Sequence, residues 1–272
     1  MTIRNIMVAF NGSESAVSAL KYAAKMAGDS AHVTAVLAYS THEVVNSRAP
    51  WVPAKAREII EQANADILSE IEARFETAKE GFGLGGRLHF RRQTGRVDAV
   101  LAEYARGFDL LVIGQDQSEV VDEHVTIHPD RIALMSGRPV LIVPKGHDRG
   151  GCRTHAVVAW EGTRASARAL SDGLDLLEAQ GRVTVLTLGE TELARPVDEV
   201  LDHLHRHGID ASHGTLLTSP GPARALLAYC TEKDPCLLVM GAHEHSKFRE
   251  DFLGGVTTRV LRNTTVPVLL SH

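Results

Sequence analysis

The sequence repeats itself, which limits the chain to folds that can be built twice in succession. The run Val8–Ser13 matches Val158–Thr163 position by position at an offset of 150. Each run is apolar and strand-like, and each ends in a glycine and a hydroxyl residue suited to start a helix. Two further pairs match at smaller offsets, 127 for Asp109–Gly114 with Cys236–Gly241 and 128 for Arg138–Val143 with Val266–Ser271. We therefore predict two related domains.

The two copies differ in length. The drop in offset from 150 to 127 places 23 additional residues in the first copy, between Tyr39 and Gly86. The segment Gly146–Arg153 begins Gly-His-Asp-Arg-Gly-Gly and is typical of a short polar linker. With 272 residues, 44% of them hydrophobic, the chain is large enough for two cores. We predict domains over residues 1–147 and 153–272.

Each half alternates predicted strands and helices. Apolar residues on consecutive positions, as in Leu110–Ile113 and Leu237–Met240, suit strands covered by helices on both faces. Five such strands with right-handed helical crossovers form a doubly wound sheet, so the predicted fold class is α/β, with two tandem five-stranded, parallel, Rossmann-like domains. The predicted strands are 3–10, 32–39, 86–93, 109–114, 139–144, 155–161, 182–188, 209–217, 236–241 and 266–271. The predicted helices are 13–27, 54–80, 96–106, 129–136, 163–179, 195–207, 221–233 and 250–262.

The last strand of each half is outermost in this topology. An unpaired apolar edge promotes association, so we expect Pro139–Val143 and Pro267–Leu270 to meet about a pseudo-twofold axis. Ligands of doubly wound sheets bind outside the carboxyl ends of the strands. The candidate sites therefore lie at the turns after the first strand of each half, Asn11–Ser13 and Glu161–Thr163, and after the fourth, from Gly114 and Gly241.

Val158–Ala169 resembles the opening V-A-x-D-G-S turn of universal stress proteins. The segments Gly241–Ser246, Leu253–Arg262 and Val266–Leu270 together resemble the closing signature of that family, and the resemblance spans both halves. The resemblance implies an adenine nucleotide alpha hydrolase-like fold and a cytoplasmic stress-response protein of the tandem, UspA-like type. Such a protein acts through ligand or partner binding rather than strong catalysis.

Nucleotide-binding members of that family hold ATP with a G-x-x-G, nine residues, G-S/T pattern. In the second half Gly241 and Gly254 match, but Glu244 replaces the second glycine and Gly255 the hydroxyl residue. A carboxylate there costs about 1 to 3 kcal/mol through like charge and lost backbone freedom. ATP with Mg²⁺ is the one cofactor implied, and whether it binds stays open. The implied nucleotide-binding residues are Glu161, Gly162, Gly241, His243, Gly254, Gly255 and Val256.

The first half lacks this pattern. After Gly114 no second glycine and no Gly-Ser pair follow, and Asn11 stands in for the acidic residue of the opening turn. Acidic side chains in this loop disfavour phosphate. We therefore interpret this half as a structural pseudo-site. The acidic residues are Asp116, Glu119, Asp122 and Glu123.

Other chemical signals are weaker. His203 and His207 share a predicted helix face with His205 between them, but two histidines alone lack the further ligands of a zinc site. His243-Glu244-His245 is interpreted as a solvated loop, and no metal site is predicted. No Gly-x-Ser-x-Gly, His-Glu-x-x-His or Gly-Lys-Ser/Thr motif occurs, so Ser13 and Thr163 are predicted to be helix N-caps rather than nucleophiles. A nucleotide sensor and a slow ATPase using Lys247 or Arg249 remain alternatives.

Charge and composition limit the classes of molecule that the chain is expected to bind. The chain has 29 basic and 34 acidic residues and no basic run interleaved with aromatics, so nucleic acid is not an expected partner. Neither a leader nor a membrane-spanning segment is evident, so we expect no membrane partner. Unknown protein partners and a homodimer stay open. The three cysteines, an odd number without C-x-x-C spacing, are expected to be buried or idle thiols: Cys152, Cys230 and Cys236.

The inserted segment of the first half predicts a long amphipathic helix. Its apolar residues recur at helical spacing and are expected to bury against the sheet or a partner. These residues are Trp51, Ile59, Ile60, Ala63, Ile67, Leu68, Ile71 and Phe75.

Overall fold

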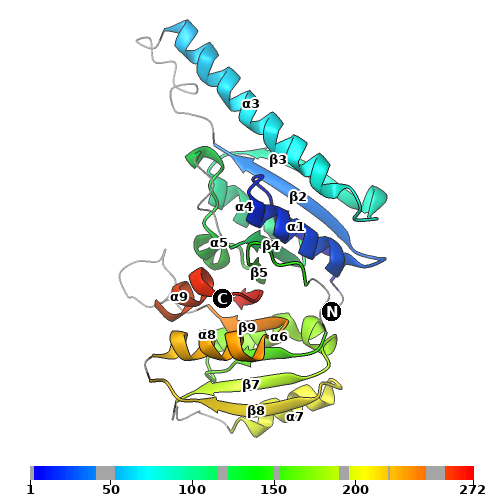
Figure 1. Ribbon diagram of the computed structural model, residues 1–272, viewed down its shortest axis with the longest axis vertical. Helices are drawn as coiled ribbons and strands as arrows, with labels where there is room; N and C mark the ends of the chain where they lie inside the picture. The colour runs from blue at the N-terminus through cyan, green and yellow to red at the C-terminus, as the bar shows by residue number, and fades with distance from the viewer. Residues whose placement is uncertain are drawn as a thin grey trace.

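The computed structural model describes residues 3–40, 53–115, 122–149, 153–189, 196–219, 221–242 and 255–272. In this part of the chain ten strands form one sheet, in the order β3-β2-β1-β4-β5-β10-β9-β6-β7-β8 (Figure 1). The strands of each half are parallel to one another, and each half is doubly wound. The predicted fold class is confirmed.

The first half contains β1 (Asn5–Ala9), α1 (Glu14–Ala27), β2 (His32–Tyr39), α3 (Ala54–Lys79), β3 (Leu88–Thr94), α4 (Val97–Ala105), β4 (Leu110–Gly114), α5 (Pro129–Met135) and β5 (Val140–Val143), with 3-10 turns η1 (Gly85–Arg87) and η2 (Glu123–Val125). The second half contains β6 (Ala156–Ala159), α6 (Arg164–Glu178), β7 (Val183–Leu188), α7 (Asp198–Arg206), β8 (Ala211–Leu216), α8 (Pro222–Lys233), β9 (Leu237–Gly241), α9 (Gly255–Asn263) and β10 (Val268–Ser271). Each predicted strand and helix is present, although residues 250–254 of the last predicted helix lie outside the described residues.

The two halves are joined through their last strands. β5 and β10, the two edges expected to meet, form an antiparallel pair in which Leu141 lies opposite Leu269 and Ile142 opposite Val268. All four side chains are fully buried. Because strand alternation continues across this seam, Leu141 and Leu269 belong to the core under α1, α3, α6 and α7, whereas Ile142 and Val268 belong to the core under α4, α5, α8 and α9. The two halves therefore share both hydrophobic layers.

The long helix α3 buries less of its apolar stripe than the sequence predicts. Ile71 and Phe75 are buried against the sheet, but Ala63 is exposed and Ile59 is 61% exposed. A helix of 26 residues is about 39 Å long, whereas a seven-residue strand such as β3 spans about 23 Å. The N-terminal part of α3 therefore extends past the sheet (Figure 1). Trp51 lies outside the described residues.

The cysteines differ from one another. Cys230 of α8 is a buried free thiol, and burial raises its pKa to about 12. Cys236, directly before β9, is disulfide-bonded, so the expectation of a buried or idle thiol is wrong for this residue. Cys152 lies outside the described residues. None of the described helices combines the length and the hydrophobicity needed to cross a membrane.

Candidate functional site

The turn after β6 has the geometry that the repeat predicts. Gly162 adopts a φ of +67°, as Gly12 adopts +78° at the same position of the first half. Thr163 then caps α6: its hydroxyl accepts from the Ser166 amide at 3.2 Å, while the Ser166 hydroxyl accepts from the Thr163 amide at 3.0 Å. This reciprocal pair satisfies two free amides of the first turn. Ser13 caps α1 without such a reciprocal pair, its hydroxyl accepting from the Ala16 amide at 3.1 Å, so the N-cap prediction is confirmed for both hydroxyl residues.

Gly241 ends β9 next to this turn, because β6 and β9 are neighbours in the sheet. A Cβ at Gly241 would lie 2.6 Å from the carbonyl carbon of Ala165 and 2.7 Å from the amide of Ser166. At the matching Gly114 it would lie 2.4 Å from the carbonyl carbon of Ser15. Both glycines thus let the first helix of their half approach the sheet, including in the half that lacks the phosphate pattern. The glycine that the resemblance assigns to a nucleotide has a packing role of its own.

The second-half site presents accessible residues. Glu161 and Gly162 are exposed at the end of β6, and Gly255 is exposed at the start of α9, where an added Cβ would meet no atom within 4 Å. Val256 is half-buried and the following Thr257 is buried. His243, Glu244 and Gly254 lie outside the described residues, as do Lys247 and Arg249. Within the described part of the chain, Glu161 and Gly162 thus lie near Gly241, and Gly255 at the start of α9 is exposed.

The corresponding place in the first half is covered by the chain itself. The side-chain amide of Asn11 donates to the Val125 carbonyl at 3.2 Å, and the Ser40 amide donates to the His124 carbonyl at 2.9 Å. The Ser40 hydroxyl also lies 2.8 Å from Nδ1 of His124. The side chains of Val125 and Ile127 are 4% and 3% exposed. Segment 122–127 is therefore packed over the ends of β1 and β2.

Sequence reasoning missed this cover. Its only signal was the spacing of Val125 and Ile127 by two residues, which is typical of an extended segment with one buried face. The sequence analysis used only the negative charge of this loop. Asp122 contributes to the cover, since its carboxylate accepts from the His124 amide at 2.8 Å, whereas Asp116 and Glu119 lie outside the described residues.

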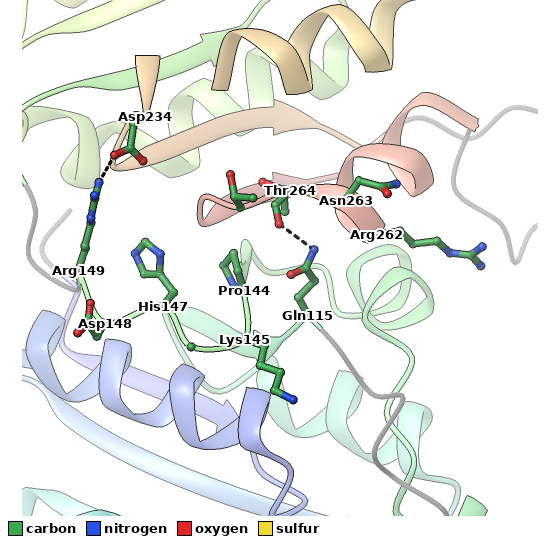
Figure 2. A pocket seen from close by; sticks show the side chains of 12 residues that line it. Gln115, Pro144, Lys145, His147, Asp148, Arg149, Asp234, Arg262, Asn263 and Thr264 are labelled. Carbon is green, nitrogen blue, oxygen red and sulfur yellow. Dashed lines mark hydrogen bonds and ion pairs between the residues drawn. The ribbon is translucent and has the colours of Figure 1, made fainter. Parts of the chain in front are cut away.

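A crevice of about 680 Å³ lies on the seam between the halves (Figure 2). The loop after β5 forms one wall and the end of α9 the other. The side-chain amide of Gln115 donates to the carbonyls of Leu261 at 2.7 Å and Thr264 at 3.0 Å, so a first-half residue caps the C-terminus of α9. Arg149 pairs with Asp234 across the crevice. The ammonium group of Lys145 pairs with Glu14, and the side chain of Arg262 points away from the crevice (Figure 2). The contacts of Gln115 and Arg149 therefore join the two halves and do not converge on a ligand.

Two histidines make stability depend on pH, namely His147, which lines the crevice at the seam, and His155, which directly precedes β6. Burial lowers the pKa of His147, with a further decrease from Arg149, and burial also lowers the pKa of His155, with Arg182 adding to it. Nε2 of His147 has no hydrogen-bond partner among the described residues, and Nε2 of His155 lies 2.9 Å from the Thr184 hydroxyl. The folded state therefore favours both neutral rings.

We predict that this contribution is complete above the ordinary histidine pKa of about 6.5 and is lost as the pH falls through that value toward the folded pKa. Urea unfolding at pH 7.5 and pH 5.5 tests this. A chain carrying His147→Gln and His155→Gln should lose less stability between the two values than the natural chain. An equal loss in both would contradict the assignment.

The three histidines of the α7 region make ordinary contacts. The rings of His203 in α7 and His207 directly after it lie 4.9 Å apart, and Nδ1 of His207 lies 3.1 Å from a carboxylate oxygen of Glu178. His205 contacts the Ala211 carbonyl at 3.1 Å. Among the described residues, no group of three or more His, Cys, Asp or Glu side chains is arranged to hold a metal ion.

Comparison with known proteins agrees with this architecture. The model of the universal stress protein family matches residues 2–144 and 202–272. The universal stress protein Slr1230 of Synechocystis is 25% identical, over 98% of this chain and 99% of its own. The crystal structure of a universal stress protein from Archaeoglobus fulgidus superimposes with a TM-score of 0.66 at 14% identity, covering 98% of this chain and 95% of that one. A putative universal stress protein from Pseudomonas aeruginosa gives 0.55 at 17% identity, covering 99% and 93%. The chain belongs to the universal stress protein family.

Proposed function

We propose that this universal stress protein acts in the stress response by binding a ligand or partner, without strong catalysis, and that its ligand site lies in the second half alone. The observation that carries the proposal is the difference between two equivalent places. In the first half Val125 and its hydrogen bonds cover the ends of β1 and β2. In the second half Glu161, Gly162 and Gly255 are exposed. We propose the cytoplasm as the compartment, as the sequence analysis predicts.

An adenine nucleotide is the ligand that the second half fits best. The backbone amides of the first turn of α9 have no intrahelical partners, and a helix N-terminus favours anions. Glu161 at the end of β6 offers a carboxylate for hydroxyl groups of a ribose. A nucleotide sensor with Mg²⁺-ATP or AMP is therefore our second candidate function, and it requires no general base. A slow ATPase remains the third.

Thermal unfolding with millimolar Mg²⁺-ATP or AMP tests the nucleotide candidate. Ligand at a hundredfold excess over its dissociation constant stabilises the chain by about 2.7 kcal/mol, which raises the midpoint by several degrees. Gly255→Glu should abolish this shift, because it puts a carboxylate at the first turn of α9. The variant should still fold, since the position is open and acidic residues suit a helix N-terminus.

Ser171→Glu supplies the control, because it adds the same charge on the exposed face of α6. It should keep the full shift. No shift in the natural chain with either nucleotide would remove the nucleotide candidate. Steady phosphate release from Mg²⁺-ATP that Gly255→Glu abolishes would contradict the non-catalytic proposal.

A further inference from the structure

The additional residues of the first half lengthen one helix beyond what its own sheet can cover. The helix between the second and third strands has 26 residues in the first half, where it is α3, and 9 residues in the second half, where it is α7. Of the residues of α3, only Ile71 and Phe75 are buried, and both lie in its C-terminal half. Residues 54–66, the protruding part of α3, therefore contribute little to the core of their own domain.

The protruding part of α3 carries an apolar stripe that leads to a second feature of the same helix. Ile59 is 61% exposed, and Ala63, one turn later, is exposed as well. Glu70, Arg74 and Thr77 follow Ala63 at spacings of seven, four and three residues, so all five lie on one face of the helix. This face is apolar at its N-terminal end, and at its C-terminal end it lies next to α1.

A groove of about 860 Å³ lies between α1 and the C-terminal half of α3, two helices that run side by side (Figure 1). Glu70, Arg74 and Thr77 belong to its lining. The guanidinium of Arg74 donates to the Gly12 carbonyl at 2.9 Å and pairs with Glu70, so this wall is fixed to the turn after β1. The apolar residues of the lining are Val17, Ala73, Ala78 and Phe82.

The groove matches the protruding part of such a helix in length and in chemistry. Residues 54–66 span about 20 Å, and residues 70–80, which run beside the groove, span about 17 Å. The apolar stripe of Ile59 and Ala63 fits a groove lined by apolar side chains. Lys55 lies at the N-terminal end of α3 and Glu80 directly after its C-terminal end, so two antiparallel copies of α3 bring opposite charges together at both ends.

We propose that a second copy of this chain occupies the groove. The α3 helices of the two chains lie antiparallel, with Ile59 and Ala63 of each chain between α1 and α3 of the other. Because the stripe and the groove lie on one face of one helix, a single twofold axis fills both grooves at once, as in the isologous interface of most homodimers. A helix of another protein would fill the groove but leave Ile59 exposed. The dimer does not depend on the ligand site, which is proposed for the other half.

Sedimentation equilibrium of the full chain tests the dimer. The natural chain should sediment with twice the mass of one chain at micromolar concentration. Ile59→Glu should weaken dimerisation about a hundredfold or more, because each dimer loses two buried isoleucines. The variant should still fold, since the position is exposed and glutamate favours helices. Leu217→Glu, which places the same charge on an exposed leucine of the second half, should leave the dimer unchanged.

Charge reversal tests the antiparallel arrangement. Lys55→Glu and Glu80→Lys should each weaken dimerisation about fivefold, and the two substitutions together should restore it. Circular dichroism checks that each variant keeps its helices. A natural chain that stays monomeric at high micromolar concentration would overturn the proposal, and so would an Ile59→Glu variant that dimerises as well as the natural chain. Dimerisation that the combined charge reversal fails to restore would contradict it as well.

Discussion

Replacing Gly114 by alanine should lower the free energy of unfolding by about 3 kcal/mol or more. The added Cβ would lie 2.4 Å from the carbonyl carbon and 2.5 Å from the carbonyl oxygen of Ser15, which are backbone atoms of α1. They can move only if the helix shifts away from β4, and overpacking of this kind usually costs 1 to 3 kcal/mol and sometimes more. Gly241→Ala should be similarly destabilising, because the new methyl group would meet the backbone of Ala165 and Ser166 at 2.6 and 2.7 Å.

Urea unfolding measures both effects, and Gly86→Ala is the matched control. A Cβ at Gly86 meets no atom within 4 Å, so that variant should change stability by no more than about 0.5 kcal/mol. If Gly241→Ala were as stable as the control, the close approach of α6 to β9 would be wrong. A loss of stability in Gly241→Ala would also mean that a loss of ligand binding in this variant can come from displacement of α6, and not only from a lost phosphate contact.

A charge introduced between β5 and β10 should lower the free energy of unfolding about as much as Gly114→Ala does. Leu269 of β10 is fully buried opposite Leu141 of β5, in the core that both halves share. Leu269→Asp removes a packed side chain and buries a carboxylate without a partner, so we expect a loss of roughly 4 kcal/mol. The loss should be greater at neutral pH than at pH 4, where the carboxyl group can take up a proton.

The same substitution at Leu217 provides the control, because that leucine is 83% exposed just after β8. Leu217→Asp should change stability by no more than about 0.5 kcal/mol. Thermal unfolding followed by circular dichroism reports both variants. A natural chain and a Leu269→Asp variant with equal midpoints would show that the antiparallel seam does not hold the halves together.

The sequence predicted the architecture because its signals are local or repeated. Consecutive apolar residues such as Leu110–Ile113 predict buried parallel strands, and the strand boundaries agree with the structure to within a few residues. The meeting of β5 and β10 could be anticipated because each half ends in an apolar strand that needs a neighbour. The long helix was predicted over 54–80 and is present over Ala54–Lys79.

Features set by tertiary contact could not be predicted in the same way. Helical periodicity shows which face of α3 is apolar but not how far the sheet extends beneath it, so the exposure of Ile59 was missed. The packing role of Gly241 depends on an approach between α6 and β9 that no local pattern records. The cover over the first-half site depends on a hydrogen bond between Asn11 and Val125, which are more than a hundred positions apart.

The two halves share the backbone features around the candidate site but differ in the residues that cover it. Both halves have the glycine turn, the capped helix and the close helix approach, so these features belong to the fold. Among the described residues, what differs is that Val125 covers Asn11 in the first half, whereas Glu161 and Gly162 of the second half are exposed. We assign ligand recognition to the features that differ.

The number of nucleotides bound per chain tests this account most directly. Isothermal titration of the natural chain with Mg²⁺-ATP should give one site per chain, and Gly255→Glu should reduce that number to zero while Ser171→Glu leaves it at one. Two sites per chain, or one site that survives in Gly255→Glu, would contradict the assignment of binding to the second half alone.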